Sequence, residues 1–434
     1  MRMTPRAGAN KVLADGSRRD MLLGIARGAL AGAAVAIGND VAAQPSPAPL
    51  RRVTQAVTPF RVVTSRAAIS DARRRLQATR WPERETVDDW RQGVPLAAIQ
   101  ALVAYWRTAY DWRRLERRLN AHPQFRTEID GLGIHFLHVR SPHAHARPII
   151  LTHGWPGSIV EFLDVIGPLT NPTKHGGRPE DAFHVVLPSL PGFGFSDKPT
   201  ESGWGLPRIA RAWSVLMRRL GYTDYLAQGG DWGAGVTTWM AKQHVEGLAA
   251  IHLNLPILFP PPVEGEPNQA EKATIAQLVA FNDKKSAYAK IQSTRPQTIG
   301  YALADSPAGQ AAWIYEKLGE WTDSNYEPER EISRDQMLDN ISLYWLTNTA
   351  ASSARLYYES FTTDFSTQRL DLPVAVSIFR GELFRPPRLW GERVYSRLFY
   401  WHEAAHGGHF AAFEQPAVFV AELRAAFRAL ARGG

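Results

Sequence analysis

The stretch that decides the fold is Gly229-Gly230-Asp231-Trp232-Gly233. Residues 222–228 before it have the pattern of a short strand, and the apolar residues from Val236 to His244 recur at helical spacing. Glycines on both sides of Asp231 favour a sharp strand-to-helix turn, because a side chain there collides with the returning backbone. An ordinary loop turn is the alternative, since Gly and Asp are common turn formers.

A carboxylate at the tip of such a turn has its own chemistry. Strand-to-helix turns of this kind usually carry a serine, whose alkoxide attacks carbonyl carbons. A carboxylate instead displaces a leaving group from a saturated carbon, and water then hydrolyses the alkyl ester that remains on the protein. We therefore expect Asp231 to act as a nucleophile that forms an ester.

Strand and helix patterns alternate on both sides of this turn. Residues 148–152 and 184–187 are short apolar runs typical of buried parallel strands, and residues 207–221 have one apolar helical face. The alternation predicts a doubly wound α/β sheet, preceded by a hairpin over residues 125–139. Together with the turn at Asp231, this is the pattern of the α/β-hydrolase fold, with a mostly parallel sheet.

The remaining segments divide the chain into further parts. Residues 96–110 predict an N-terminal helical domain, and the helical stretch rich in Tyr and Trp after Pro256 predicts a cap. The core then resumes with a helix near residues 344–358, strands at 374–379 and 398–401, and a terminal helix at 416–430. The predicted boundaries are a signal peptide over 1–43, a Pro-rich linker over 44–56, the N-terminal helical domain over 57–124, the core over 125–257 and 344–434, and the helical cap over 258–343.

The first residues predict export. Residues 17–23 read Ser-Arg-Arg-Asp-Met-Leu-Leu, which resembles a twin-arginine signal, and a modestly apolar stretch rich in Ala and Gly follows. Val41-Ala42-Ala43 then offers small residues suited to signal-peptidase cleavage. Arg27 interrupts the apolar stretch, which falls short of the roughly 20 apolar residues of a membrane span. We expect export to the periplasm or beyond, and no membrane span in the mature chain.

Composition narrows the classes of function. The chain has 434 residues, of which 44% are hydrophobic and 21% charged, and it contains no cysteine, so we expect a globular protein without disulfides. The formal net charge is +8, yet no long basic run or nucleic-acid-binding module is present. The densest arginine clusters, at 73–75 and 113–118, lie on helical patterns and are expected to be solvated helix faces. We therefore expect no nucleic-acid partner.

A carboxylate nucleophile needs a base to activate water and an acid to orient that base. His409 follows the last predicted strand, and Glu382 follows the strand that ends at Phe379. The order nucleophile, acid, histidine along the chain is the order that α/β hydrolases use. Asp364 and Asp371 are the alternatives to Glu382 as the orienting acid.

The tetrahedral intermediate of ester hydrolysis also needs backbone N–H donors. Trp232 directly follows the nucleophile, and Trp155 lies in the loop His153-Gly154-Trp155-Pro156-Gly157-Ser158 after a predicted strand. We expect these two N–H groups to form the oxyanion hole. His153 is expected to support this loop rather than to act as a second base.

These motifs together resemble the epoxide hydrolases of the microsomal and juvenile-hormone type, which are α/β hydrolases with a distinctive N-terminal helical domain. The resemblance covers nearly everything after about Val57. It rests on four stretches: His153–Ser158, Pro191-Gly192-Phe193-Gly194-Phe195-Ser196, Gly229–Gly233 and Gly407-Gly408-His409-Phe410-Ala411-Ala412-Phe413-Glu414.

The resemblance implies the roles of several residues. It implies Asp231 as the nucleophile, His409 as the base, and Glu382 in Phe379–Leu383 as the orienting acid. It also implies that Tyr288 and Tyr357 hydrogen-bond the epoxide oxygen and protonate the departing alkoxide. Tyr358, the neighbour of Tyr357, leaves this second assignment open.

Two short motifs suggest other ligands. His402-Glu403-Ala404-Ala405-His406 fits the H-E-x-x-H zinc pattern, but that pattern needs a helix, and these residues continue a strand-like aromatic run that ends at Gly407-Gly408. We therefore expect no metal site. Gly192-Phe193-Gly194 lacks the third glycine and following helix of a dinucleotide loop, and we expect it to shape the pocket.

The sequence leaves three functions open. The first is an epoxide hydrolase that needs no cofactor and converts a small apolar epoxide and water into a vicinal diol. The second is a haloalkane or haloacid dehalogenase with the same Asp-His-acid machinery, in which Trp232 forms half of a halide clamp. The third is a catalytically silent protein that binds a small molecule on this fold. The paired tyrosines and the N-terminal domain favour the epoxide hydrolase. Whether the chain forms a homo-oligomer stays open.

Overall fold

The computed structural model describes residues 55–258, 266–361, 363 and 369–433. The predicted signal peptide and all but the last two residues of the predicted linker lie outside the described residues, so export stays a prediction. All described residues belong to one unit of the fold. None of the described helices is both long and apolar enough to span a membrane.

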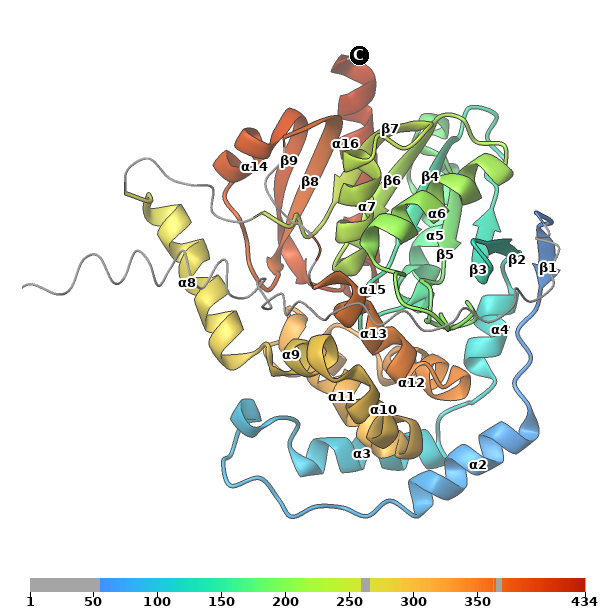
Figure 1. Ribbon diagram of the computed structural model, residues 1–434, viewed down its shortest axis with the longest axis vertical. Helices are drawn as coiled ribbons and strands as arrows, with labels where there is room; N and C mark the ends of the chain where they lie inside the picture. The colour runs from blue at the N-terminus through green and yellow to red at the C-terminus, as the bar shows by residue number, and fades with distance from the viewer. Residues whose placement is uncertain (1–54, 259–265, 362, 364–368, 434) are drawn as a thin grey trace, which may run out of the picture. The chain divides into compact units, whose positions relative to one another are not determined.

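A nine-stranded sheet lies at the centre of the described part of the chain (Figure 1). Its order is β1-β2-β3-β5-β4-β6-β7-β8-β9; the strands from β5 onward in this order pair in parallel, and the pairs among β1, β2, β3 and β5 are antiparallel. The predicted hairpin is β2–β3, and the predicted buried strands are β4 and β5. The strands span Thr58–Phe60 (β1), Gln124–Ile129 (β2), Leu132–Val139 (β3), Arg147–Thr152 (β4), Phe183–Pro188 (β5), Tyr225–Gly229 (β6), Leu248–Leu253 (β7), Leu370–Gly381 (β8) and Tyr395–Gly408 (β9).

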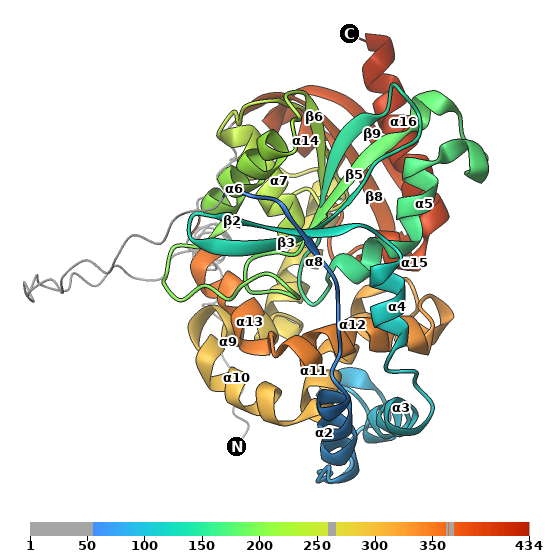
Figure 2. The same cartoon turned by 90° about the vertical axis from the view of Figure 1, so that its right-hand side faces the viewer.

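Helices cover both faces of this sheet, as the alternation predicts (Figure 2). Helices α5 and α16 pack on each other at one face, and α6 and α7 do so at the other. The indole N–H of Trp213 on α6 donates to Thr152 Oγ at the end of β4, 3.1 Å away. The helices span Leu163–Thr170 (α5), Leu206–Arg219 (α6), Trp232–Lys242 (α7), Arg388–Val394 (α14), Ala411–Glu414 (α15) and Pro416–Gly433 (α16).

Helices α9 to α13 lie below the sheet in Figure 1, and α8 lies to its left. The helix predicted near 344–358 is two helices, because α12 ends at Thr347 and Asn348 adopts a left-handed conformation with φ of 51°. The boundary predicted after residue 343 therefore falls inside α12, and α13 packs against α9 and α10. These helices span Gln269–Lys284 (α8), Ala287–Thr294 (α9), Pro296–Asp305 (α10), Pro307–Trp321 (α11), Arg334–Thr347 (α12) and Ala350–Ser360 (α13).

The N-terminal helices pack against the same group of helices. The indole N–H of Trp106 on α3 donates to Ser342 Oγ of α12 at 3.0 Å, and Arg118 of α4 pairs with Asp339 of α12 at 3.0 Å. Strand β1 was not predicted, because three residues are too few to show an alternating pattern. The helices are α2 (Arg66–Gln77), α3 (Leu96–Thr108) and α4 (Arg114–Asn120), and short 3-10 helices lie at Trp90–Gln92 (η1), Ile159–Phe162 (η2), Pro172–His175 (η3), Pro179–Asp181 (η4) and Pro328–Arg330 (η5).

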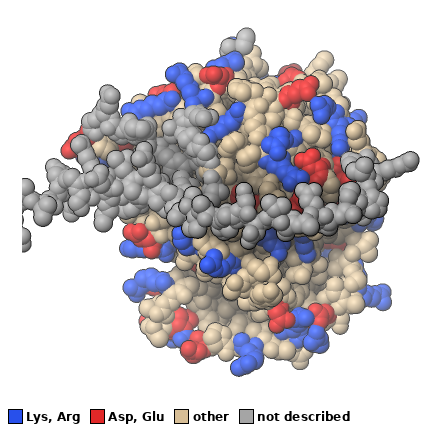
Figure 3. All heavy atoms as spheres, viewed as in Figure 1, with Lys and Arg blue, Asp and Glu red and all other residues tan. Residues whose placement is uncertain are grey.

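Basic and acidic side chains are interspersed on the face shown in Figure 3. In the arginine cluster on α2, Arg75 pairs with Asp71 at 2.8 Å, and at the start of α4 Arg113 pairs with Glu116 at 2.6 Å. Ion pairs at partly exposed positions such as these contribute little to stability. The cluster on α2 fits the prediction of a solvated helix face. The cluster at 113–118 fits it only in part, because Arg114 and Arg118 pair with the buried Asp339 of α12.

Candidate active site

The turn at Asp231 joins β6 to α7, as the sequence predicts. Its backbone has φ of 50° and ψ of −131°, which is a strained conformation for a residue with a side chain. The flanking glycines have no room for one: a Cβ on Gly229 would lie 2.1 Å from Gly233 O, and a Cβ on Gly233 would lie 1.9 Å from Thr152 O. The stretch is therefore a strand-to-helix turn and not an ordinary loop.

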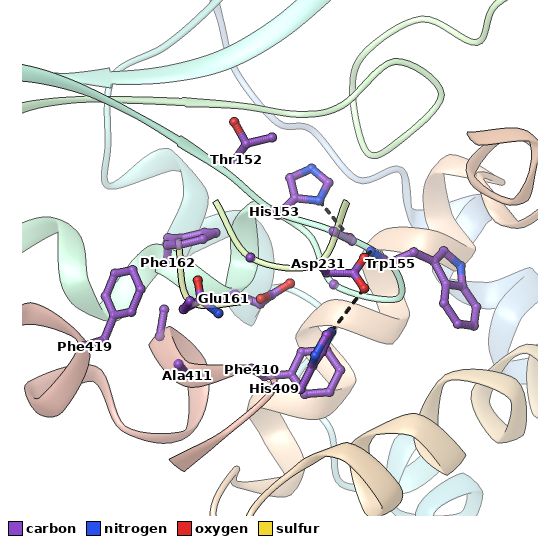
Figure 4. A pocket seen from close by; sticks show the side chains of 15 residues that line it. Thr152, His153, Trp155, Glu161, Phe162, Asp231, His409, Phe410, Ala411 and Phe419 are labelled. Carbon is purple, nitrogen blue, oxygen red and sulfur yellow. Dashed lines mark hydrogen bonds and ion pairs between the residues drawn. The ribbon is translucent and has the colours of Figure 1, made fainter. Parts of the chain in front are cut away.

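The Asp231 carboxylate is held by the loop after β4. Its Oδ1 accepts the Trp155 backbone N–H at 2.8 Å (Figure 4). Gly154 permits this approach, because a Cβ there would lie 2.2 Å from Asp231 Oδ1. Trp232 is the first residue of α7, so its N–H is one of the donors that have no partner within the helix. Both predicted oxyanion-hole residues thus lie next to Asp231.

His409 lies on the other oxygen of the same carboxylate. It directly follows β9, and its Nε2 is 3.3 Å from Asp231 Oδ2 (Figure 4). Its backbone N–H donates to Trp321 O at 2.9 Å, and the Trp321 ring packs edge-on against the imidazole. The histidine is therefore fixed in position from α11 as well as from the strand.

Glu382 holds the second imidazole nitrogen. It follows β8, is buried, and places its Oε1 2.7 Å from His409 Nδ1. The same oxygen accepts the Leu383 N–H at 2.8 Å. Of the two alternatives, Asp371 near the start of β8 bonds Ser396 Oγ at 2.9 Å, and Asp364 lies outside the described residues. Asp231, His409 and Glu382 thus form a continuous chain of contacts.

The pKa of His409 reflects this arrangement. Burial acts to lower the pKa of the imidazole, but the nearby carboxylates of Glu382 and Asp231 outweigh it and hold the pKa well above the usual value. Removing the charge of Asp231 would therefore lower the pKa of His409.

Tyr288 on α9 and Tyr357 on α13 meet next to Trp155, beside Asp231. The Tyr288 ring stacks on the Trp155 ring with centroids 5.1 Å apart, and the Tyr357 ring packs edge-on against Trp232 at 4.7 Å. The two phenol rings pack edge-on with their centroids 5.8 Å apart. Burial, followed by other contributions that include the charge of Asp231, raises the pKa of each phenol well above 10.

The structure distinguishes Tyr357 from its neighbour. Tyr357 is 2% exposed and lies among the aromatic rings beside Asp231, whereas Tyr358 is 55% exposed. The helical geometry of α13 explains this, since adjacent residues on a helix point in different directions. Only Tyr357 therefore faces the candidate site.

Lys317 is a neighbour of the site that the sequence analysis missed. It lies on α11, is 2% exposed, and its ammonium is 4.6 Å from the centroid of the Tyr288 ring. Its charge is balanced by Glu316 at 2.8 Å and Glu320 at 3.4 Å. A cation over an aromatic face attracts the ring electrostatically and helps to fix its orientation. The sequence alone shows only an ordinary helical lysine.

Glu161 is the second residue that the sequence analysis missed. It belongs to η2, directly after the His153–Ser158 loop, and lines a small cavity together with Asp231 and His409 (Figure 4). His153, in contrast, has the supporting role that was predicted: its Nε2 accepts the Leu190 N–H at 3.2 Å, and burial lowers its pKa to about 4. A neutral imidazole there holds two loops together.

The two motifs that suggested other ligands have structural explanations. His402 and His406 lie in strand β9, so this stretch is not the helix that the zinc pattern needs, and His402 Nδ1 lies 2.9 Å from Glu422. Among the described residues, no group of three or more His, Cys, Asp or Glu can hold a metal ion. Gly192 O accepts a hydrogen bond from Ser352 Oγ at 2.6 Å, so that loop positions α13.

Comparisons with known proteins identify the family. Residues 57–162 match the model of the epoxide hydrolase N terminus, and residues 147–299 match that of the alpha/beta hydrolase fold. The chain is 63% identical over 377 residues to a protein of Stigmatella aurantiaca named "Putative epoxide hydrolase", covering 86% of this chain and 85% of that protein. It is 34% identical over 413 residues to epoxide hydrolase 1 of Sus scrofa, covering 88% of this chain and 90% of that protein.

A solved structure agrees with this assignment. The epoxide hydrolase of Aspergillus niger superposes with a TM-score of 0.78 at 34% sequence identity, over 86% of this chain and 96% of that chain. The fold predicted from the sequence, an α/β-hydrolase fold with a mostly parallel sheet, is confirmed. The chain belongs to the epoxide hydrolase family.

Proposed function

We propose that this epoxide hydrolase opens its substrate through a covalent ester on Asp231. A carboxylate oxygen of Asp231 attacks one carbon of the epoxide ring, and the bond between that carbon and the ring oxygen breaks. The departing oxygen takes a proton from the pair formed by Tyr288 and Tyr357. An alkoxide is a poor leaving group, so a proton donor at this point lowers the barrier.

Water then releases the product. The water oxygen attacks Cγ of the Asp231 ester while His409 Nε2 takes one of its protons, and Glu382 stabilises the imidazolium that forms. The Trp155 N–H, together with that of Trp232, stabilises the oxyanion of the tetrahedral intermediate. The intermediate collapses and the leaving oxygen takes the proton from His409. The second proton of the water leaves Asp231 and restores the proton that the tyrosine pair gave up, so the diol departs from a restored carboxylate.

The observation that carries this proposal is the surroundings of the single carboxylate. Asp231 lies 3.3 Å from His409 Nε2 and 2.8 Å from the Trp155 N–H, and two buried phenols lie in the aromatic group beside it. The rings of Trp155, Tyr288 and Tyr357 pack against one another, which favours a small apolar epoxide.

The alternative of a dehalogenase requires indole N–H groups that are free to bind halide. The Trp232 ring instead packs edge-on against the Tyr357 ring at 4.7 Å, and this pairing with a candidate proton donor supports the epoxide over the halide. The decisive comparison is parallel turnover of styrene oxide and a bromoalkane by the purified wild type and the Asp231→Ala variant.

We expect styrene oxide to give the diol with the wild type, and we expect the variant to lose activity by about 10⁴-fold or more, because the nucleophile is absent. Bromide release without diol would instead establish the dehalogenase. Diol formation by the variant at a rate close to wild type would contradict the role of Asp231.

We also propose that the chain is exported by the twin-arginine route. The support is the Ser17–Leu23 motif and the small residues before Gln44, which lie outside the described residues. The test is the localisation of the chain with its own leader and with the double substitution R18K and R19K. We expect the wild type outside the cytoplasm, and retention of the double variant inside. Equal export of both would contradict the route.

A further inference from the structure

A small cavity lies directly behind the nucleophile. Asp231, His409, Glu161 and Asn254 contribute polar groups to its lining, and Phe162 and Phe419 contribute apolar ones (Figure 4). Its volume is about 20 Å³. By the same measure a buried water needs roughly 10–15 Å³ and between two and four polar partners. The cavity therefore has the size and the polarity to hold one water between His409 and Glu161.

The Glu161 carboxyl is fixed at one end and unpartnered at the other. Its Oε1 accepts the Ser158 N–H at 2.9 Å, as part of the cap of η2. No described residue donates to or accepts from the other oxygen, Oε2. Gly157 leaves space for the carboxyl, because a Cβ there would lie 1.4 Å from Glu161 Oε1. In Figure 4 the carboxyl extends toward Asp231, on the side opposite to the Trp155 indole.

The charge state of Glu161 suits this position. Burial raises its pKa to about 8, with the charges of Asp231 and Glu414 acting in the same direction and that of His409 opposing them. At neutral pH the carboxyl is therefore mainly protonated. It adds a hydrogen-bonding group beside Asp231 without a second negative charge, which would repel the nucleophile's carboxylate and the oxyanion of the hydrolytic step.

We propose that Glu161 is a positioning residue for the water that hydrolyses the Asp231 ester, an inference that rests on the ester mechanism proposed above. The water donates one hydrogen bond to His409 Nε2 and accepts one from Glu161 Oε2, which carries the carboxyl proton because Oε1 accepts the Ser158 N–H. Its free lone pair is then directed at Cγ of the ester. Glu161 takes no proton in this step: the water proton goes to His409, and the ester C–O bond breaks when the diol leaves.

The test separates the two chemical steps in Glu161→Met and Glu161→Gln. Met cannot donate a hydrogen bond to the water, whereas Gln keeps both functions: its amide oxygen accepts the Ser158 N–H and its amide nitrogen donates in place of Oε2. The matched control is Ser158→Ala, which removes the bonds from Ser158 Oγ to Asn340 at 2.7 Å and from the Val160 N–H at 3.2 Å but keeps the carboxyl. His409→Gln serves as the reference variant, because it lacks the base.

Each enzyme is mixed with excess styrene oxide, quenched in acid at increasing times, and analysed by denaturing mass spectrometry for the ester on Asp231. For Glu161→Met we expect ester formation within about threefold of wild type and ester hydrolysis slower by about tenfold or more, so that the ester accumulates. For Glu161→Gln we expect hydrolysis close to the wild-type rate. For Ser158→Ala we expect both rates close to wild type.

The outcomes distinguish the inference from the mechanism on which it rests. Ester in His409→Gln together with unchanged hydrolysis in Glu161→Met would overturn the role of Glu161 and leave the mechanism standing. Equal slowing of hydrolysis in Glu161→Met and Ser158→Ala would show that Glu161 acts only through the cap, which also overturns it. No ester on Asp231 in any enzyme that makes diol would overturn the ester mechanism, and the inference with it.

Discussion

The two sides of the Asp231 carboxylate offer opposite chemistry. On the side of the Trp155 indole, Tyr288 and Tyr357 keep their protons, because burial holds the pKa of both phenols well above 10. On the other side, His409 is held by Glu382 and opens onto a small cavity that Glu161 also lines. In the proposed mechanism, one side donates protons and the other accepts them.

This difference matches the needs of the two steps. Epoxide opening needs an acid, since a strongly basic oxygen departs, and ester hydrolysis needs a base, since water must lose a proton. A single site that performs both steps has to prevent direct proton transfer from the phenols to His409. In the proposed site the Asp231 carboxylate lies between them. Substitutions on the two sides should therefore affect different steps.

The largest effect is expected for the accepting side. His409→Gln keeps the size of the side chain but removes the base, so turnover should fall by about 10³-fold or more while Asp231 is still alkylated. Rapid quenching followed by mass spectrometry measures both rates. Slower alkylation with unchanged hydrolysis would reverse the roles of the two sides.

The donating side should show the opposite pattern. The double variant Tyr288→Phe and Tyr357→Phe lacks both proton donors, so alkylation should slow by about 10²- to 10³-fold and little ester should accumulate. Each single variant keeps one donor and should lose less. Tyr358→Phe is the matched control, because this exposed neighbour does not face the site. A loss in the control as large as in Tyr357→Phe would contradict the assignment.

A substitution that displaces the Asp231 carboxylate should affect both sides. In Gly154→Ala the new Cβ would lie 2.2 Å from Asp231 Oδ1, so the carboxylate must move away from the Trp155 N–H. We expect alkylation and hydrolysis both to slow by about 10- to 100-fold. Gly167→Ala on α5 is the control, since its Cβ would find its nearest atom, His175 Nε2, at 3.4 Å. Selective loss of one step would contradict a shared nucleophile.

The smallest expected effect concerns stability and pH. The folded pKa of Glu161 is about 8, above the usual 4.5, so between these values the unfolded chain has released a proton that the folded chain keeps. The contribution of Glu161 to the free energy of unfolding is therefore fully present below pH 4.5 and is lost as the pH rises toward 8.

Glu161→Gln cannot titrate, so its free energy of unfolding relative to wild type should rise between pH 5.5 and 7.5, by at most about 1.4 kcal/mol per pH unit. Urea unfolding at both pH values measures the difference. The buried Glu414, whose pKa is also about 8, is present in both proteins and cancels. A difference that stays constant with pH would show that Glu161 is ionised when folded.

The accepting side was largely predictable from the sequence. Glycines around Asp231 dictate a tight turn, and His409 and Glu382 directly follow strands whose carboxyl ends meet at one edge of the sheet. Local patterns carry this information because a parallel sheet brings successive strand ends together. The parallel strands β4, β5 and β6 were predicted for the same reason.

The donating side was not predictable from local pattern. Tyr288 and Tyr357 lie on helices whose placement depends on packing between α9, α10 and α13, and only the resemblance to known epoxide hydrolases indicated them. Glu161 and Lys317 were missed altogether, since their burial and their neighbours come from segments distant in sequence. The break between α12 and α13 depends on one residue, Asn348, in a left-handed conformation.

The most direct test of the ester mechanism is a single turnover with enzyme in excess over styrene oxide, carried out in water labelled with ¹⁸O. The mechanism predicts that the first diol contains no label, because its new oxygen comes from Asp231, and that the label appears in the peptide that contains Asp231. Label in the first diol and none in the peptide would show that water attacks the epoxide directly, and would contradict the central role given to Asp231.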